Sequence, residues 1–290
     1  MSSGNQPRLS LSDFDVISTI GSGATGTVLK ARLKDNNKEI SGGKSFYAIK
    51  RIKLDKGCWR NLNEVFKMKH IAHPNIIKCH ASFFEDSFFY IVMEYADKGD
   101  LFTRIKKQKA SDKFFPEKDL WEIAWQMCLG LLHMNSNKLI HRDIKAMNVL
   151  WVDNTIKIAD LGESEYLGSD NFNTEKKIVG TPLFLSPEVT RNEDYDYRVD
   201  TWALGCTLYH WAALEPPFNS ESKEVLMKLI QQKTPKPLEN SYSVKFKEFV
   251  FKLLEKQKSK RPFVVELIDM FPQFFSLSST IDLTNYNILK

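Results

Sequence analysis

The sequence contains few cysteines, and none of them is spaced for a metal or redox motif. Four occur among 290 residues, at Cys58, Cys79, Cys128 and Cys206. A chain of this length can bury a hydrophobic core without covalent cross-links, so we expect reduced, mainly structural thiols rather than disulfides or a zinc site. Reduced thiols favour an intracellular location, either cytoplasmic or nuclear.

The sequence also lacks a long hydrophobic run, a secretory signal and a strong charge bias. Its longest apolar stretch, Val199 to Leu214, contains Asp200 and His210 and is too short to span a bilayer, which favours a buried helix. The first seven residues are polar, so no secretory signal is expected. The formal net charge is +5 without a dense basic run, so we expect neither a membrane nor a nucleic acid as partner. Heptad repeats are missing too, and the oligomeric state stays open.

The apolar pattern divides the chain into a strand-rich part and a helical part. Strands are predicted around 14–20, 28–32, 46–52, 76–83 and 88–94, with one helix over about 62–71. After Gly99 the pattern becomes helical, most clearly from Leu120 to His133. We therefore predict an α+β fold with a small strand-rich N-terminal lobe, which has one main helix, and a larger, mainly helical C-terminal lobe.

One segment carries the side chains that phosphoryl transfer requires. It is His141-Arg142-Asp143-Ile144-Lys145-Ala146-Met147-Asn148, and Asp160-Leu161-Gly162 follows it. Asp143 can orient a hydroxyl and accept its proton, and Lys145 can neutralise phosphate charge. Asn148 and Asp160 offer the hard oxygen ligands that suit Mg²⁺. Unrelated surface polar groups are a poor explanation of this spacing.

A glycine-rich segment near the N-terminus supplies a second phosphate signal. Gly21, Gly23 and Gly26 form Gly-x-Gly-x-x-Gly, which alone fits a dinucleotide site or a surface turn equally well. Here a strand pattern from Val28 follows, not a helix, which favours a hairpin that lays backbone N–H groups over phosphates. Lys50 lies on the next predicted strand. By itself it fits a solvent-facing lysine, but together with the glycine segment it is expected to contact a phosphate.

Together these motifs resemble the eukaryotic protein kinases over about residues 12–273. Further matches are Ser186-Pro187-Glu188, Asp200-Thr201-Trp202-Ala203-Leu204-Gly205 and Lys260-Arg261-Pro262. The closer resemblance is to the NIMA-related group, through segments 91–95, 99–101, 179–188 and 214–218. This resemblance implies a tail over 1–11, a kinase domain over 12–275 and a second tail over 276–290. The domain divides into an N-lobe (about 12–94), a hinge (about 94–99) and a C-lobe (about 100–275).

The resemblance also implies a role for each site residue. Glu64 is the helix glutamate that pairs with Lys50. The adenine-pocket residues are Ile20, Val28, Ala48 and Leu150, which sandwich the ring, Met93 behind it, and Glu94 and Ala96, which offer backbone hydrogen bonds. Met68, His141, Leu161 and Asp200 join a packed stack of side chains. Glu188 and Arg261 form a buried ion pair. ATP and Mg²⁺ are the implied cofactors, and the partner is a protein substrate with a serine or threonine hydroxyl, as Lys145 and Gly180-Thr181-Pro182 indicate.

The chain departs from the family pattern at two positions near the proposed magnesium ligand. Leu161 replaces the more frequent phenylalanine, and little is lost because both are apolar. Glu163 stands where an apolar or small residue is common, which leaves the substrate preference open.

A third departure concerns activation. Lys177 occupies the position where many of these kinases carry a phosphorylated serine or threonine, whose phosphate would pair with Arg142. Lysine accepts no phosphate, so either Thr174 or Ser169 takes over this role or ordering needs no phosphate.

Two alternatives remain beside an active protein kinase. A pseudokinase scaffold would bind partners without catalysis, but such chains usually lack one of Lys50, Asp143, Asn148 and Asp160, and all four are present here. A small-molecule kinase could share the fold, but the segment 180–188, which docks a peptide in the resembling family, argues against it.

Overall fold

Two units divide the chain after Asp97. In this computed structural model, the N-terminal unit is Met1–Asp97 and the C-terminal unit is Lys98–Lys290. The structure describes residues 9–23, 26–34, 40, 45–54, 59–167 and 179–271. The predicted tail 276–290 and most of the tail 1–11 lie outside these ranges. No helix within them is long and apolar enough to cross a bilayer.

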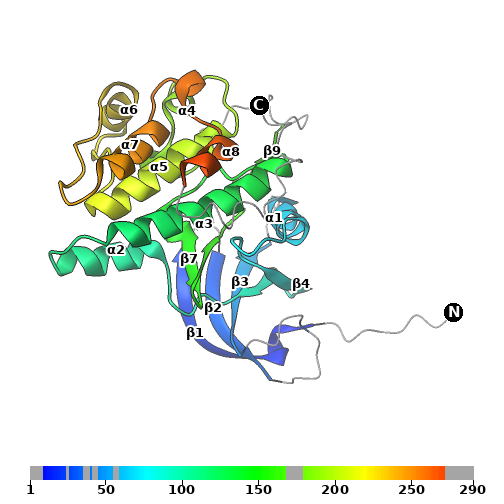
Figure 1. The fold of residues 1–290 in the computed structure, drawn as a ribbon. Helices are drawn as coiled ribbons and strands as arrows, with labels where there is room; N and C mark the ends of the chain where they lie inside the picture. The colour runs from blue at the N-terminus through cyan, green and yellow to red at the C-terminus, as the bar shows by residue number, and fades with distance from the viewer. Residues whose placement is uncertain are drawn as a thin grey trace. The chain divides into compact units, whose positions relative to one another are not determined.

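The N-terminal unit is built on a five-stranded antiparallel sheet (Figure 1). The short helix η1 (Leu11–Asp13) precedes strands β1 (Phe14–Gly23), β2 (Gly26–Leu33), β3 (Tyr47–Lys53), β4 (Cys79–Glu85) and β5 (Phe88–Glu94), which are arranged in the order β1-β2-β3-β5-β4. Ala31, Ile49 and Val92 are fully buried in its core. The apolar pattern predicted strands at these five places, although β3 and β5 are buried over four consecutive residues, 47–50 and 89–92, rather than on alternating positions.

One predicted strand begins later than expected. We placed it from Ile76, but β4 starts at Cys79, and Ile76 instead donates its backbone N–H to His73 O in a turn. Ile76 and Ile77 are 1% and 2% exposed. Ile76 forms only an isolated β-bridge before the strand begins, so the apolar run reflects burial more than strand pairing, which periodicity cannot distinguish over so short a run.

The glycine segment is the β1–β2 hairpin, as its sequence context indicated. Gly23 and Gly26 face each other at its tip. Gly26 has a φ of +123°, and a Cβ atom there would lie 2.4 Å from Arg51 O. Only glycine fits this position, because a side chain would collide with the neighbouring strand.

The helix of this unit, α1 (Trp59–His70), contacts β4. It begins three residues before the predicted start at Leu62 and ends one residue before Ile71. Val65 and Met68 are buried, as the spacing predicted, and so is Glu64. A carboxylate on the buried face of a helix requires a partner, since an unpaired buried charge is very costly.

The C-terminal unit consists mainly of helices (Figure 1). They are α2 (Leu101–Ala110), α3 (Glu117–Ser136), α4 (Pro187–Thr190), α5 (Arg198–Ala213), α6 (Lys223–Gln232), α7 (Val244–Leu253) and α8 (Val264–Leu267), with the short helices η2 (Ala146–Asn148), η3 (Pro182–Phe184), η4 (Lys258–Lys260) and η5 (Ile268–Met270). Two short antiparallel pairs join them, β6 (Leu139–Ile140) with β9 (Glu165–Tyr166) and β7 (Val149–Val152) with β8 (Thr155–Ile158).

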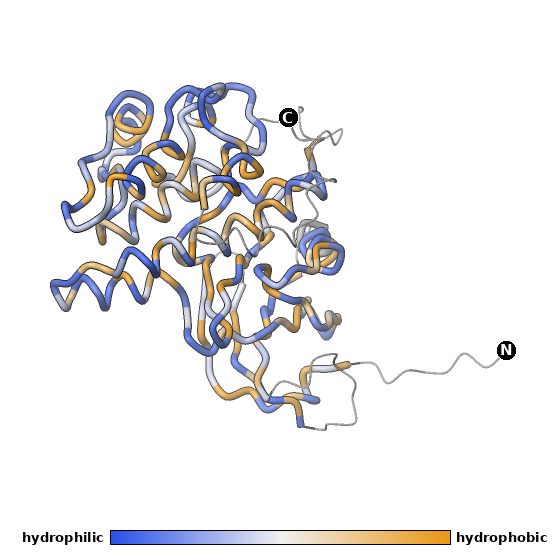
Figure 2. The backbone as a smooth tube through the Cα atoms, in the orientation of Figure 1, coloured by the Kyte–Doolittle hydropathy of each residue, from blue (hydrophilic) through white to orange (hydrophobic). Residues whose placement is uncertain are grey.

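Helix α5 is the buried helix that the longest apolar stretch predicted. Every residue from Val199 to Ala212 is buried, and α5 packs against α3 and α7. Helix α3 has a different pattern, because polar residues recur between its apolar ones (Figure 2). The helices α3 and α5 therefore form the core on which the loops of this unit rest.

A buried ion pair fixes α4. Arg261 donates from Nη1 to Glu188 Oε1 at 2.6 Å and from Nη2 to Oε2 at 2.9 Å. Both residues are 1% exposed. The remaining donors of Arg261 bind backbone carbonyls, Arg198 O at 3.0 Å and Glu255 O at 3.0 Å. The two-pronged geometry matches an arginine to a carboxylate in a place that water does not reach.

Candidate active site

In the N-terminal unit, Lys50 is paired with Glu64. Lys50 Nζ lies 2.9 Å from Glu64 Oε1 and 3.1 Å from Oε2, and the two residues are 5% and 3% exposed. The pair joins β3 to α1. A buried lysine side chain whose ammonium group is bound by a carboxylate has few alternative rotamers. The position of the Lys50 ammonium group is therefore fixed before any ligand binds.

The expected adenine-pocket residues lie on the strands around Lys50. Ala48 faces Met93 across the β3–β5 ladder, and Val28 faces Lys50 across the β2–β3 ladder. Ile20 on β1 is 48% exposed, like its strand neighbours Val16 (47%) and Ile17 (51%).

The remaining adenine-pocket residues lie at and beyond the end of β5 and in the C-terminal unit. The amide of Glu94 donates to Lys78 O at 2.9 Å, so a bond from its backbone to adenine would use its carbonyl. Ala96 follows two residues later and is half-buried. Leu150 belongs to the C-terminal unit, on β7.

In the C-terminal unit, helix α5 anchors the segment 141–148. Asp200 accepts hydrogen bonds from His141 N at 2.7 Å and Arg142 N at 2.9 Å. Burial raises the pKa of Asp200, and these backbone donors oppose that shift because they stabilise its ionised form. His141 and Leu161, which were assigned to packing, are fully buried. The loop is thus fastened to the most buried helix of the unit.

Asp143 is the centre of a small polar network. Its Oδ2 accepts from Lys145 Nζ at 2.6 Å and from Asn148 Nδ2 at 3.1 Å. Its Oδ1 accepts from the Thr181 hydroxyl at 2.9 Å and the Thr181 amide at 3.0 Å. Lys145 Nζ also donates to Thr181 Oγ1 at 2.8 Å. The carboxylate, 8% exposed, is therefore oriented from both sides.

The motif around Thr181 was apparent from the sequence, but the contact of Thr181 with Asp143 was not. A glycine makes this contact possible. Gly180 has a φ of +98°, and a Cβ atom there would lie 2.6 Å from Arg142 O. The segment that carries Thr181 therefore approaches the loop of Asp143 at backbone distance. The sequence Gly180-Thr181-Pro182 contained the glycine that permits this contact and the threonine that makes it, but it indicated only that the acceptor hydroxyl belongs to serine or threonine.

Asn148 and Asp160 are brought together by the β7–β8 pair. Ala159 N donates to Asn148 O at 2.9 Å, and Asp160 follows Ala159 directly. Asn148 Nδ2 also donates to Asp143 O at 2.9 Å, so its side chain is anchored through nitrogen. The two residues supply an amide oxygen and a carboxylate, which are the donors that Mg²⁺ prefers. The donor set fits that ion.

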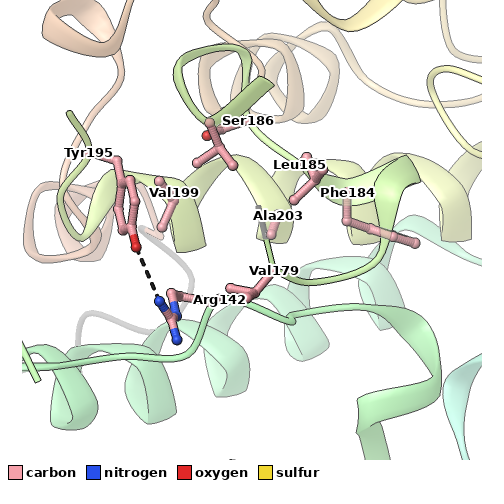
Figure 3. Close-up of a pocket in the computed structure, with 9 residues that line it drawn as sticks. Arg142, Val179, Phe184, Leu185, Ser186, Tyr195, Val199 and Ala203 are labelled. Carbon is pink, nitrogen blue, oxygen red and sulfur yellow. Dashed lines mark hydrogen bonds between the residues drawn. The ribbon is translucent and has the colours of Figure 1, made fainter. Parts of the chain in front are cut away.

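Arg142 has partners that the sequence analysis missed. Its Nε donates to Glu163 O at 2.6 Å, and its Nη1 binds the Glu165 carboxylate and the Tyr195 hydroxyl, the latter at 3.1 Å (Figure 3). Nothing in the sequence singled out Glu165 or Tyr195. The expected phosphosites Ser169 and Thr174 lie outside the described residues, as does Lys177.

A small cavity adjoins Arg142 (Figure 3). Its volume is about 30 Å³, and its lining is mostly apolar: Arg142, Val179, Phe184, Leu185, Ser186, Val189, Tyr195, Val199 and Ala203. It is large enough for a water molecule.

The fold and these groups are those of a protein kinase domain. The chain belongs to the protein kinase domain family, which it matches over residues 14–271. Membership implies ATP as the phosphoryl donor and a protein as the acceptor.

Among individual proteins, the similarity is to the Nek kinases, so the predicted resemblance to the NIMA-related group is confirmed. The chain is 35% identical over 260 residues to serine/threonine-protein kinase Nek3 of Mus musculus, covering 89% of this chain and 49% of that protein. It is 34% identical over 262 residues to Nek5 of Mus musculus, covering 89% and 40%. For Nek11 of Homo sapiens the identity is 32% over 258 residues, covering 86% and 38%. The chain thus spans less than half the length of each of these relatives.

Proposed function

We propose that this chain is an active serine/threonine protein kinase, which transfers the γ-phosphoryl group of MgATP to a serine or threonine hydroxyl of a protein. The observation that supports it best is the network around Asp143. Lys145, Asn148 and Thr181 hold the Asp143 carboxylate in one orientation. A group that aligns an acceptor hydroxyl for transfer needs such a fixed orientation. A scaffold without catalysis needs no such orientation.

Each group has a distinct task in this proposal. Asp143 orients the acceptor hydroxyl and takes its proton late, because the transition state is loose and the hydroxyl remains largely protonated until then. Lys145 neutralises charge on the transferred group, and Lys50, fixed by Glu64, contacts the phosphates of ATP. Asn148 and Asp160 would hold Mg²⁺, which when bound neutralises the phosphate charge.

Substitution of Asp143 by asparagine tests the proposal. The amide keeps the shape of the carboxylate but accepts no proton, so we expect transfer of radiolabelled γ-phosphate to casein to fall by about 10²–10⁴-fold. Asp112→Asn is the matched control, since Asp112 is exposed and its φ of +54° suits asparagine equally well. Phosphoserine or phosphothreonine in the acid-hydrolysed product identifies the acceptor class. Equal transfer by the wild type and Asp143→Asn, with the same melting temperature, would support the scaffold instead.

A further inference from the structure

The guanidinium group of Arg142 already has an anionic partner within the fold. Arg142 directly precedes Asp143, and its Nη1 binds the Glu165 carboxylate. The side chains are 16% and 22% exposed, so the pair is largely shielded from water. A neutral carbonyl, Glu163 O, and the hydroxyl of Tyr195 complete the contacts.

Strand pairing places Glu165 beside Arg142. Strand β9 is antiparallel to β6, with Glu165 opposite Ile140 and Tyr166 opposite Leu139. Ile140 is two residues before Arg142, so the ladder fixes the carboxylate next to the loop that carries the arginine. The pair does not depend on residues outside the described ranges.

The same ion pair links two segments of the proposed active site. Glu165 lies five residues after Asp160, and the chain between them is folded as a turn in which Ser164 N and Oγ donate to Leu161 O at 3.2 and 2.6 Å. Arg142 therefore joins the segment of Asp143 to the segment of Asp160. Tyr195, from the chain leading into α5, adds a third segment (Figure 3).

Charge explains why this arrangement bears on activation. In many protein kinases an arginine is paired only after a loop residue is phosphorylated, and the new ion pair orders the site. Here a carboxylate already neutralises Arg142. A phosphate brought to the same guanidinium group would meet the like charge of Glu165, which disfavours its binding.

We propose that Glu165 is a positioning residue that permanently supplies the anion for Arg142. Through Arg142 it holds Asp143 and the Asp160 segment in place, so that phosphoryl transfer does not require phosphorylation of the chain itself. This inference rests on the proposed kinase activity and adds to it the basis of activation.

The first experiment compares the full chain as purified with the same protein after treatment with phosphatase. Intact-mass spectrometry confirms the removal of phosphate, and initial rates are measured with ATP and casein. We expect kcat to agree within about twofold, because the anion is part of the fold. A large loss of activity after treatment, in a protein that was active before it, overturns the inference and leaves the proposed function standing. Absence of Asp143-dependent transfer in both samples removes the proposed function, and the inference with it.

The second experiment removes the charge of Glu165. In the phosphate-free protein, Glu165→Gln should lower kcat about tenfold, as expected for one hydrogen bond to a charged group, with the KM for ATP unchanged. Glu165→Asp keeps the charge and should recover part of this loss. Glu193→Gln is the matched control, because Glu193 forms an exposed pair with Arg191 in the same unit. The inference fails if Glu165→Gln behaves like the control, or if Glu165→Asp and Glu165→Gln are equally impaired.

Discussion

The buried pair of Glu188 and Arg261 allows a sharp stability prediction. Glu188→Gln keeps the size of the side chain and removes its charge. Arginine side chains stay ionised in proteins. The variant therefore leaves the guanidinium group of Arg261, a residue that is 1% exposed, with neutral partners such as Arg198 O and Glu255 O. We therefore expect the free energy of unfolding of the C-terminal unit to fall.

The magnitude follows from the burial of both partners. Breaking such a pair on one side costs about 3–5 kcal/mol, because the remaining charge is uncompensated. For a domain of this size, at about 3 °C per kcal/mol, the melting temperature should decrease by roughly 10 °C. Calorimetry measures this change. The control is again Glu193→Gln, whose exposed ion pair with Arg191 should leave the melting temperature unchanged.

A double variant separates the ion pair from the loss of packing. Glu188→Gln together with Arg261→Met removes both charges, so the double variant should be less destabilised than the sum of the two single variants. The argument from the uncompensated charge is refuted if Glu188→Gln has the same melting temperature as Glu193→Gln. It is also refuted if the losses of unfolding free energy in the two single variants add up to the loss in the double variant.

Two further predictions concern turnover and pH. Thr181→Val removes the hydroxyl between Asp143 and Lys145, so kcat should fall about tenfold while the KM for ATP is unchanged. Steady-state kinetics measure this, with Thr155→Val on strand β8 as the control. An unchanged kcat in Thr181→Val would refute the prediction. Burial lowers the pKa of His210 from 6.5 to about 4 in the folded state, with Lys109 adding to the shift and Glu215 opposing it. Because the unfolded chain binds the proton first, stability conferred by neutral His210 is present above pH 6.5 and is lost as the pH falls toward 4, by up to about 3 kcal/mol. His210→Leu should therefore unfold with a weaker pH dependence in this window in urea titrations; an identical dependence in both proteins would contradict the assignment.

The local motifs were readable from the sequence because their chemistry is contained in short segments. Gly21, Gly23 and Gly26 followed by a strand pattern favoured a hairpin, and the structure pairs Gly23 with Gly26. Lys50 and Glu64 lie on consecutive elements, and the resemblance to the family predicted their pairing, although the gap between them is shorter than is usual in that family. The roles proposed for these residues toward ATP remain predictions.

Contacts between distant segments were not readable in the same way. Arg142 and Glu165 meet because β6 pairs with β9, and Thr181 reaches Asp143 because Gly180 permits close backbone approach. The start of β4 was also misplaced, since Ile76 and Ile77 are as buried as strand residues.

The sequence by itself determined the protein family and the fold class, and it predicted which residues would carry phosphoryl-transfer chemistry, because these inferences depend on residue type at short spacing. Only the tertiary structure decided which charge neutralises Arg142 and which hydroxyl orients Asp143. The physical reason is that an ion pair or hydrogen bond across 23 or 38 residues depends on strand register and backbone approach, and neither leaves a periodic trace in the chain.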